Sequence, residues 1–226
     1  MDRPSVRFGS ESTHLVVFDL DGTILDSLPD IAGGLNAVRR NLGFEPLPLP
    51  SVKRGIGKGA KVLIERTMTD VIEAGATPEK LYERFMVEYR VHSVAQPRLY
   101  PFADEFMMIA EQTAELAVLT NKPLEITERT LEALDLTDRF VSVLAPENCR
   151  APKPDPVGLL DLLDERGVAH DAALLIGDSS NDFGAGRRAE VPTVGMRHGY
   201  HDHQPPEPDL WVDDFEALLD LWHNPS

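Results

Sequence analysis

The stretch His14–Thr23 reads HLVVFDLDGT, and it decides the fold. Its first half is a short apolar, β-branched run, which predicts a buried strand, and its second half places acids and a glycine where that strand ends. Asp19 and Asp21 stand two residues apart, so in extended chain their side chains share a face, unless the turn at Gly22 rotates Asp21 away. Two close carboxylates repel each other unless a cation lies between them or one takes a proton. The stretch therefore predicts a strand that delivers reactive carboxylates to a loop.

The chain beyond Pro101 alternates between helical and strand patterns. Strands are expected over 115–120, 140–144, 172–176 and 193–195, and helices over 102–112, 124–134, 155–166, 181–189 and 215–222. Strands that alternate with helices predict a parallel sheet with both faces covered. The predicted fold is α/β, a doubly wound, Rossmann-like core.

The intervening stretch has helical patterns only. Ser27 is expected to cap a helix that runs to about Asn41, and the prolines of residues 46–50 predict an extended connector. Further helices are predicted over 60–73 and 78–93. The second of these carries an apolar stripe that we interpret as a core, formed by Leu81, Phe85, Met86 and Tyr89. We therefore expect an N-terminal tail at 1–14, an α/β core of 15–28 and 98–226, and an inserted helical cap at 29–97.

Composition narrows the possible partners and compartments. The chain has 22 Lys and Arg against 38 Asp and Glu, a net charge of −16, which disfavours nucleic acid and anionic membranes as partners. Its one cysteine, Cys149, excludes an intrachain disulfide and a multi-cysteine zinc site, and we do not expect a thiol nucleophile. No apolar run approaches the roughly 20 residues of a membrane span, and no signal-peptide pattern opens the chain. We expect a cytoplasmic protein, monomeric or homodimeric.

Polar side chains recur where the predicted strands end. Ligands of such sheets bind beyond the carboxyl ends of the strands, so these side chains are expected to share one crevice. They are Asp19, Asp21, Thr120, Lys153, Asp178 and Asp182. Hard oxygen ligands favour Mg²⁺, which also bridges to phosphate oxygens. An aspartate can act as a covalent nucleophile, a second carboxylate can protonate the leaving alkoxide, and a hydroxyl and a lysine can bind the transferring oxygens.

Four segments carry a resemblance to a known family. They are Asp19–Asp26 (DLDGTILD), Leu119–Asn121 (LTN), Lys153–Pro154 (KP) and Gly177–Asp182 (GDSSND). In this order, over about residues 15 to 215, they resemble the four motifs of the haloacid dehalogenase-like hydrolase superfamily. The chain is thus identified as a member of that superfamily.

The resemblance implies a magnesium-dependent phosphatase that works through an aspartyl-phosphate. It implies Asp19 as the nucleophile and Asp21 as the general acid and base. It implies Mg²⁺ held by Asp19, Asp178 and the backbone carbonyl of Asp21. The residues implied to bind the phosphoryl group or to support the site are Thr120, Lys153, Asn121 and Asp182. The helical insert corresponds to a cap that closes over the site and excludes water.

Within the superfamily the chain is most similar to bacterial phosphoglycolate phosphatases. The similarity includes Gly55–Ala60 (GIGKGA), Leu119–Pro123 (LTNKP) and His198–Tyr200 (HGY). It implies 2-phosphoglycolate, a small phosphorylated metabolite, as the substrate, with glycolate and phosphate as products. The chain departs from the family at Phe102, where a glycine usually follows Tyr-Pro, and at Ala145–Cys149, where a Gly-Gly-acidic run is usual.

Several residues have two interpretations. Arg54 and Lys58 either read the carboxylate of the substrate or form a solvated basic face, and we weigh these equally. We interpret Lys122 as a surface cation and Asp26 as a helix-start residue. His198, His201 and His203 form either a transition-metal site or a solvated surface, and we favour the surface.

Rival functions exist within and outside enzymes. Another small phosphosugar phosphatase, a pyrophosphatase and a sugar phosphomutase use similar residues. A non-catalytic phosphometabolite-binding protein can share the fold, since fold alone does not determine function. The presence of both Asp19 and Asp21 argues against that non-catalytic role.

Overall fold

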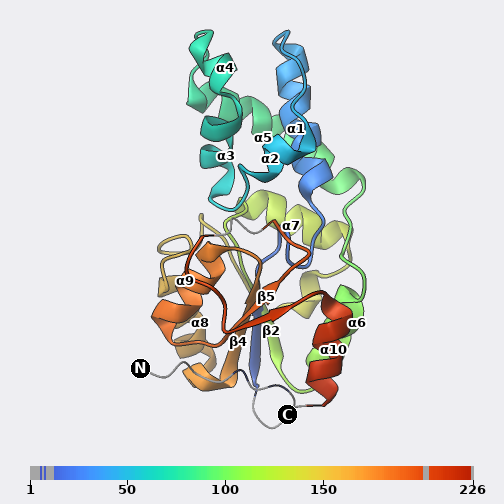
Figure 1. Cartoon of the computed structure of the whole chain (residues 1–226), viewed down its shortest axis with the longest axis vertical. Helices are drawn as coiled ribbons and strands as arrows, with labels where there is room; N and C mark the ends of the chain where they lie inside the picture. Colours follow the sequence, from blue (N-terminus) through green and yellow to red (C-terminus); the bar gives the residue numbers. More distant parts are fainter. Residues whose placement is uncertain (1–5, 7, 9–12, 201–203, 225–226) are drawn as a thin grey trace.

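Six parallel strands form the centre of the larger part of the molecule (Figure 1). The computed structural model describes residues 6, 8, 13–200 and 204–224, and all residue-level statements here concern that part of the chain. In spatial order the strands are β3 (Ser142–Leu144), β2 (Glu115–Leu119), β1 (Leu15–Phe18), β4 (Ala173–Gly177), β5 (Thr193–Met196) and β6 (Leu210–Val212). Strand β1 therefore lies at the centre, paired in register with β2 and β4.

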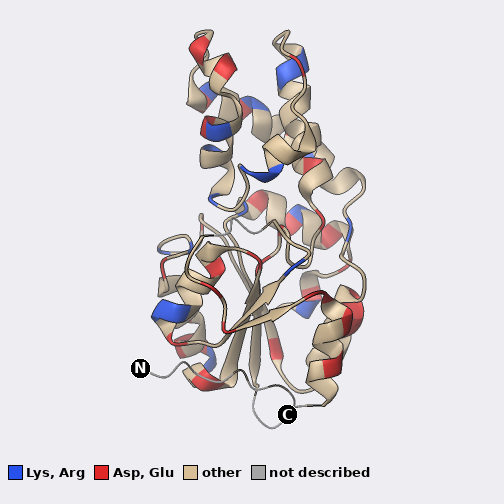
Figure 2. Ribbon diagram, viewed as in Figure 1, with Lys and Arg blue, Asp and Glu red and all other residues tan. Residues whose placement is uncertain are grey.

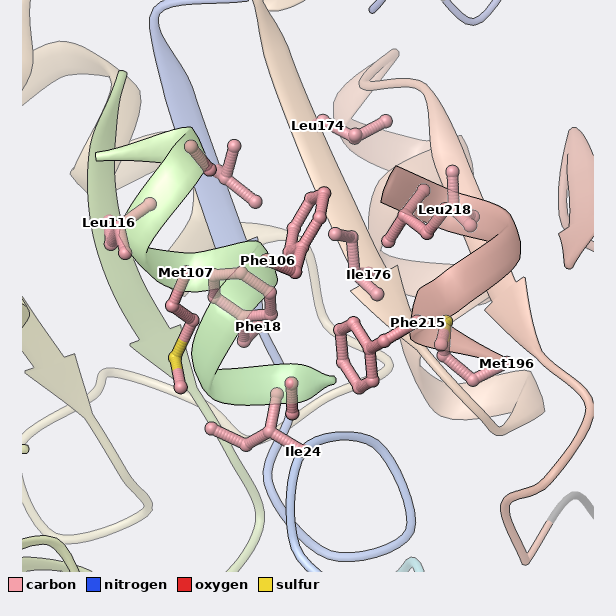
Figure 3. Packing of buried hydrophobic residues seen from close by; sticks show 14 of the residues in the cluster. Phe18, Ile24, Phe106, Met107, Leu116, Leu174, Ile176, Met196, Phe215 and Leu218 are labelled. Atoms are coloured by element: carbon pink, nitrogen blue, oxygen red, sulfur yellow. The ribbon is translucent and has the colours of Figure 1, made fainter. Parts of the chain in front are cut away.

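Each face of the sheet is covered by helices. Helices α6 (Ala103–Ala110) and α10 (Phe215–His223) cover one face, and α8 (Val157–Arg166) and α9 (Ser180–Ala189) cover the other. Alternate residues of β1 point to opposite faces, so Phe18 packs with Phe106 and Phe215 of the first pair (Figure 3) while Val17 faces the second. Burial on both faces explains why the strands read as continuous apolar runs.

The remaining helices form a separate layer above the sheet, which we call the helical unit. It comprises α1 (Leu28–Asn41), α2 (Leu49–Lys53), α3 (Gly59–Thr67), α4 (Thr69–Glu73) and α5 (Pro78–Ala95). These helices enclose their own apolar cluster, which includes Leu35, Ile64 and Phe85. Helix α7 (Leu124–Ala133) lies between this layer and the sheet, and its Ile126 joins the cluster (Figure 1). We call the rest of the chain the sheet unit.

The chain crosses between the two units twice, at adjacent points. Leu25 and Leu99 form an antiparallel bridge, and the Asp26 N–H donates to the Arg98 carbonyl over 2.9 Å. The Tyr100 N–H donates to the Ile24 carbonyl over 3.0 Å. The two connections therefore form a short two-stranded ribbon beneath helix α1.

The doubly wound α/β core is confirmed, and several local predictions are wrong. Residues 46–50 were expected to be extended, yet Pro50 lies in the first turn of helix α2, where no N–H is needed. The helix predicted over 60–73 is broken at Met68 into α3 and α4. Strand β6 was not predicted at all. No described helix is both long enough and apolar enough to span a bilayer. Of the predicted tail, Phe8 packs against Trp222.

Candidate active site

The carboxyl ends of β1, β2 and β4 meet at the edge of the sheet that faces the helical unit. Asp19 follows β1, Thr120 follows β2 and Asp178 follows β4, and all three side chains are buried. They lie at the floor of a cavity of about 550 Å³, within the range of ligand pockets. The chain topology thus brings together residues up to 159 positions apart, as the strand-end reasoning predicted.

Lys153 lies buried behind Asp19 of this floor. The Lys153 ammonium lies 2.9 Å from Asp19 Oδ1 and 2.5 Å from Asp182 Oδ1, and it donates to the Leu119 carbonyl over 2.5 Å. Both carboxylate partners are almost fully enclosed. Although burial opposes the change, the carboxylates of Asp182 and Asp19 raise the pKa of Lys153 to about 12. Lys153 therefore stays a cation beside the Asp19 carboxylate.

Three carboxylates are placed to share one cation. Ligand oxygens of Asp19, Asp178 and Asp182 all lie within 4.8 Å of one another. Burial raises the pKa of Asp19 to about 6 and the pKa of Asp178 well above its usual value, with repulsion from neighbouring carboxylates adding to the effect. The Lys153 ammonium contacts two of these carboxylates and supplies one positive charge against three acids, so a hard divalent cation with oxygen preference fits the donor set.

The Asp178 carboxylate is held from two sides. The Tyr200 N–H donates to its Oδ2 over 2.5 Å, and the Thr23 hydroxyl donates to its Oδ1 over 3.3 Å. Gly22 and Gly199 leave room for this approach, because a Cβ at Gly22 would lie 2.5 Å from Asp178 Oδ2 and one at Gly199 would collide with the Asp178 side chain. Sequence reasoning missed Tyr200, although the HGY segment was the available signal.

Asp182 links helix α9 to the same cluster. Its Oδ2 accepts hydrogen bonds from the N–H groups of Asp178 (3.2 Å) and Ser179 (3.0 Å), which is the N3 half of a capping box. Its Oδ1 is left for Lys153. Gly177 lies directly behind this carboxylate, and a side chain there would displace it. Asp182, which was predicted to support the site, thus lies against Lys153 and the N-terminus of helix α9.

Asn121 joins three segments of the chain. Its Oδ1 accepts from the Lys153 N–H (2.9 Å), and its Nδ2 donates to the carbonyls of Lys153 (2.9 Å) and Gly57 (3.0 Å). Asn181 Nδ2 donates to the same Gly57 carbonyl over 3.2 Å. The loop between α2 and α3 is therefore docked on the sheet unit through one carbonyl.

The interpretation of Lys122 as a surface cation is wrong. Its side chain is 1% exposed, and Nζ lies 2.7 Å from Asp21 Oδ1. It also donates to the Tyr89 hydroxyl and lies 4.7 Å from the centroid of that ring. The burial comes from partners in the loop after β1 and on α5, so no pattern near Lys122 in the sequence reveals it. Its N–H meanwhile donates to Thr120 Oγ1 over 3.2 Å.

Basic residues of the helical unit line the roof of the cavity. They are Lys53, Arg54, Lys58 and Arg66. Figure 2 shows basic segments on the side of the helical unit that faces the sheet. Among the described residues none of the four has a carboxylate within ion-pair distance; Arg54 donates only to the Ser51 hydroxyl (3.2 Å), and Lys53 lies 5.6 Å from the Tyr200 ring centroid.

Predictions at the start of helix α1 and in the histidine loop need correction. Ser27 makes no capping hydrogen bond; instead the Leu28 N–H donates to the Tyr200 hydroxyl over 2.8 Å. That hydroxyl donates to Asp26 over 3.2 Å, so Asp26 serves this contact rather than the helix start. His198 is half-buried rather than fully solvated, since its ring stacks on Tyr100 at 3.9 Å and its Nε2 lies 3.0 Å from the Thr23 carbonyl oxygen. His201 and His203 lie outside the described residues.

Comparisons with known proteins agree with this geometry. The model of the haloacid dehalogenase-like hydrolase family matches residues 16–196. A phosphoglycolate phosphatase of Psychrobacter arcticus is 32% identical over 217 residues, which cover 92% of this chain and 94% of that protein. One of Agrobacterium fabrum is 35% identical over 211 residues, 90% of each chain.

Solved structures show the same fold. The crystal structure of "a predicted phosphoglycolate phosphatase" from Haemophilus somnus has a TM-score of 0.84 and 29% identity, covering 94% of this chain and 99% of that one. The Bacillus subtilis hydrolase YfnB, bound to magnesium, has a TM-score of 0.76 at 19% identity, covering 94% of this chain and 99% of that one, and shows the fold alone.

Proposed function

The chain belongs to the haloacid dehalogenase-like hydrolase family, and on that premise we propose that this phosphatase hydrolyses 2-phosphoglycolate with Mg²⁺ through an aspartyl-phosphate on Asp19. One observation carries the proposal. The Asp19 carboxylate lies 2.9 Å from a buried ammonium, in a cavity whose roof supplies four cations without carboxylate partners among the described residues. In a chain of net charge −16, such a concentration of unneutralised cations fits a substrate with anionic groups at both ends.

The proposed chemistry has two displacements at phosphorus. An Asp19 oxygen attacks phosphorus, the bond to the ester oxygen breaks, and the carboxylic acid of Asp21 donates its proton to the leaving alkoxide. The Asp21 carboxylate then takes a proton from water, which attacks the aspartyl-phosphate, releases phosphate and restores the Asp19 carboxylate. Lys153 and Thr120 bind the equatorial phosphoryl oxygens, where negative charge is spread in the transition state.

The metal would be held by Asp19, Asp178 and the backbone carbonyl of Asp21. Asp182 would support the site by pairing with Lys153 and by accepting the hydrogen bond of the Ser179 N–H at the start of α9. The ion would neutralise the developing charge on the phosphoryl group and offset the repulsion between the carboxylates. The donor set is oxygen only, which is the preference of Mg²⁺.

The helical unit serves as the cap in this proposal, with residues 29–97 as the inserted domain and 15–28 and 98–226 as the core. Two facts support it: the unit encloses its own apolar cluster, and its α2–α3 loop meets the sheet unit over the reacting carboxylate. Arg54 and Lys58 would then read the carboxylate of 2-phosphoglycolate. Closure would exclude water from the site.

A panel of phosphomonoesters tests the proposal. With Mg²⁺ present, 2-phosphoglycolate is expected to give the highest kcat/KM, and Asp19→Asn to abolish turnover of every ester. A different ester in first place would overturn the substrate assignment, and turnover by Asp19→Asn would overturn the mechanism.

The roof cations are tested by charge removal. Arg54→Ala with Lys58→Ala is expected to lower kcat/KM for 2-phosphoglycolate by about 10-fold or more, as loss of charge-assisted hydrogen bonds does. Phenyl phosphate, which lacks the second anionic group, should lose much less. Arg40→Ala, an exposed cation near the far end of helix α1, is the matched control. An unchanged kcat/KM for 2-phosphoglycolate would favour the solvated-face interpretation, and equal losses on both esters would show that the two residues do not read the second anionic group.

A further inference from the structure

The Lys122 ammonium lies at the junction of the two units and is bonded to both. It donates to Asp21 Oδ1 over 2.7 Å in the sheet unit, and to the Tyr89 hydroxyl of helix α5 in the helical unit. We infer that Lys122, held by Tyr89, is a positioning residue for Asp21, so that seating of helix α5 fixes the carboxylate that transfers the proton. The inference rests on the proposed function, in which Asp21 acts on the leaving group.

Burial forces Lys122 to keep these partners. Its side chain is 1% exposed, and that of Asp21 is 14% exposed. An ammonium removed from water must be paired, because an uncompensated buried charge is strongly destabilising. Lys122 lies three residues after strand β2, in the loop that also carries Thr120 and Asn121, so its backbone is fixed by the sheet unit. The direction of its ammonium in turn restrains the orientation of the Asp21 carboxylate.

Tyr89 supplies the contact that depends on the helical unit. It is buried, and its ring stacks on Phe85 at 4.8 Å with an interplanar angle of 25°, so its hydroxyl has a fixed direction. Burial raises the Tyr89 pKa well above its usual value, so the phenol remains neutral and its oxygen accepts a hydrogen bond from the ammonium. The stacked ring and its hydroxyl both belong to helix α5.

Two simpler roles make different predictions. A purely structural ion pair between the units would change the hydrolysis of every ester by the same factor when it is removed. A lysine that reads a second anionic group of the substrate would matter only for esters that carry one. A residue that positions the proton donor matters in proportion to how much the leaving group needs a proton.

Substituted phenyl phosphates separate these roles, because they differ in leaving-group pKa and carry no second anionic group. We would measure kcat/KM with Mg²⁺ for the wild type, Lys122→Met, Lys122→Arg and Tyr89→Phe. For Lys122→Met and Tyr89→Phe, phenyl phosphate is expected to lose about 10-fold and 4-nitrophenyl phosphate less than about 2-fold, within the contribution of general acid catalysis. The plot of log kcat/KM against leaving-group pKa becomes steeper, and Lys122→Arg restores part of the wild-type slope.

A second lysine–tyrosine pair, within the helical unit, supplies matched controls. Lys61 lies over the Tyr82 ring at 5.8 Å, away from the cavity, so Lys61→Met and Tyr82→Phe repeat the substitutions on a lysine–tyrosine pair that does not touch Asp21. Both controls should keep the wild-type slope.

Three outcomes would count against this assignment. A uniform loss with an unchanged slope would identify a structural ion pair, and a loss confined to 2-phosphoglycolate would identify an anion-reading lysine; either overturns the inference. If Lys122→Met does not fold, Tyr89→Phe decides alone, because it keeps the ammonium and the ring. A wild-type protein that hydrolyses neither 2-phosphoglycolate nor any of the phenyl phosphates would overturn the proposed function itself, before any variant is compared.

Discussion

Phe102 adopts a backbone conformation that suits glycine. Its φ is +62° and its ψ is 0°, and the Ala103 N–H donates to the Tyr100 carbonyl over 3.2 Å. Pro101 and Phe102 are therefore the central residues of a type II turn, which requires positive φ at its second central position. The side chain is 45% exposed, so it gains little from packing in return. The sequence departure at this position thus carries a conformational cost.

We predict that Phe102→Gly stabilises the protein by about 0.5–1 kcal/mol, because relief of the left-handed strain exceeds the added entropy of the unfolded glycine. Chemical denaturation in urea measures the change. Phe102→Ala removes the same ring but keeps a Cβ, so it should not be stabilised. A glycine variant no more stable than the alanine variant would contradict this account.

Individual site residues were predictable only where their signal lies in the local sequence. Asp19, Thr120 and Asp178 each follow an apolar strand, and the parallel topology brings such positions together without further information. The environment of Lys122 was not predictable, because its partners Asp21 and Tyr89 are 101 and 33 residues away in the chain. Its burial is a product of tertiary packing.

At the scale of elements, the loop between α2 and α3 depends on one carbonyl. Gly57 has a φ of +110°, and its carbonyl accepts hydrogen bonds from both Asn121 and Asn181. The Asn121 and Asn181 side chains differ in their other hydrogen bonds. Among the described residues the Asn181 side chain donates only to this carbonyl, whereas Asn121 also holds the N–H and the carbonyl of Lys153.

We predict that Asn181→Ala raises KM for 2-phosphoglycolate by about 2- to 10-fold with little change in kcat, the effect of one hydrogen bond. Asn121→Ala should in addition lower kcat, because Lys153 loses the contacts that place its ammonium beside Asp19. Steady-state kinetics on both variants compare the two. Identical effects on kcat would show that the loop contact alone matters.

Some strands and helices could be predicted from the sequence, and others could not. Strands β1, β2 and β4 are short runs buried on both faces, and their hydrophobicity identifies them. Strand β6 has three residues, two of them only partly buried, so it lacks that signal. Helix α2 was missed because prolines usually indicate extended chain, while here Pro50 occupies the first turn that tolerates it.

For the whole molecule, the acidic cluster makes metal-free stability depend on pH. Burial raises the pKa of Asp19 and of Asp30 to about 6, and that of Asp178 well above its usual value. The folded state therefore binds more protons than the unfolded state, and the free energy of unfolding falls as pH rises from about 4 through about 6. His198 acts in the opposite direction over this range, because burial lowers its pKa.

We predict that the metal-free protein loses thermal stability between about pH 4 and about pH 6 and that Mg²⁺ reduces this loss, since the ion binds the carboxylates of the folded state. Asp178→Asn retains His198 and Asp30, so the difference between this variant and the wild type isolates the cluster. Calorimetry in chelator and in Mg²⁺ gives both values. Equal pH dependence in variant and wild type would place the effect elsewhere.

The ribbon formed by Leu25–Asp26 and Arg98–Leu99 has a consequence for how this architecture can change over time. The chain leaves the sheet unit and returns to it at neighbouring, hydrogen-bonded positions. The whole segment between these positions can therefore be replaced without moving the points where it is attached. Segments of other length or shape can be spliced there without altering strand order or register. Selection can therefore remodel what the enzyme recognises while the machinery that breaks the bond is inherited unchanged.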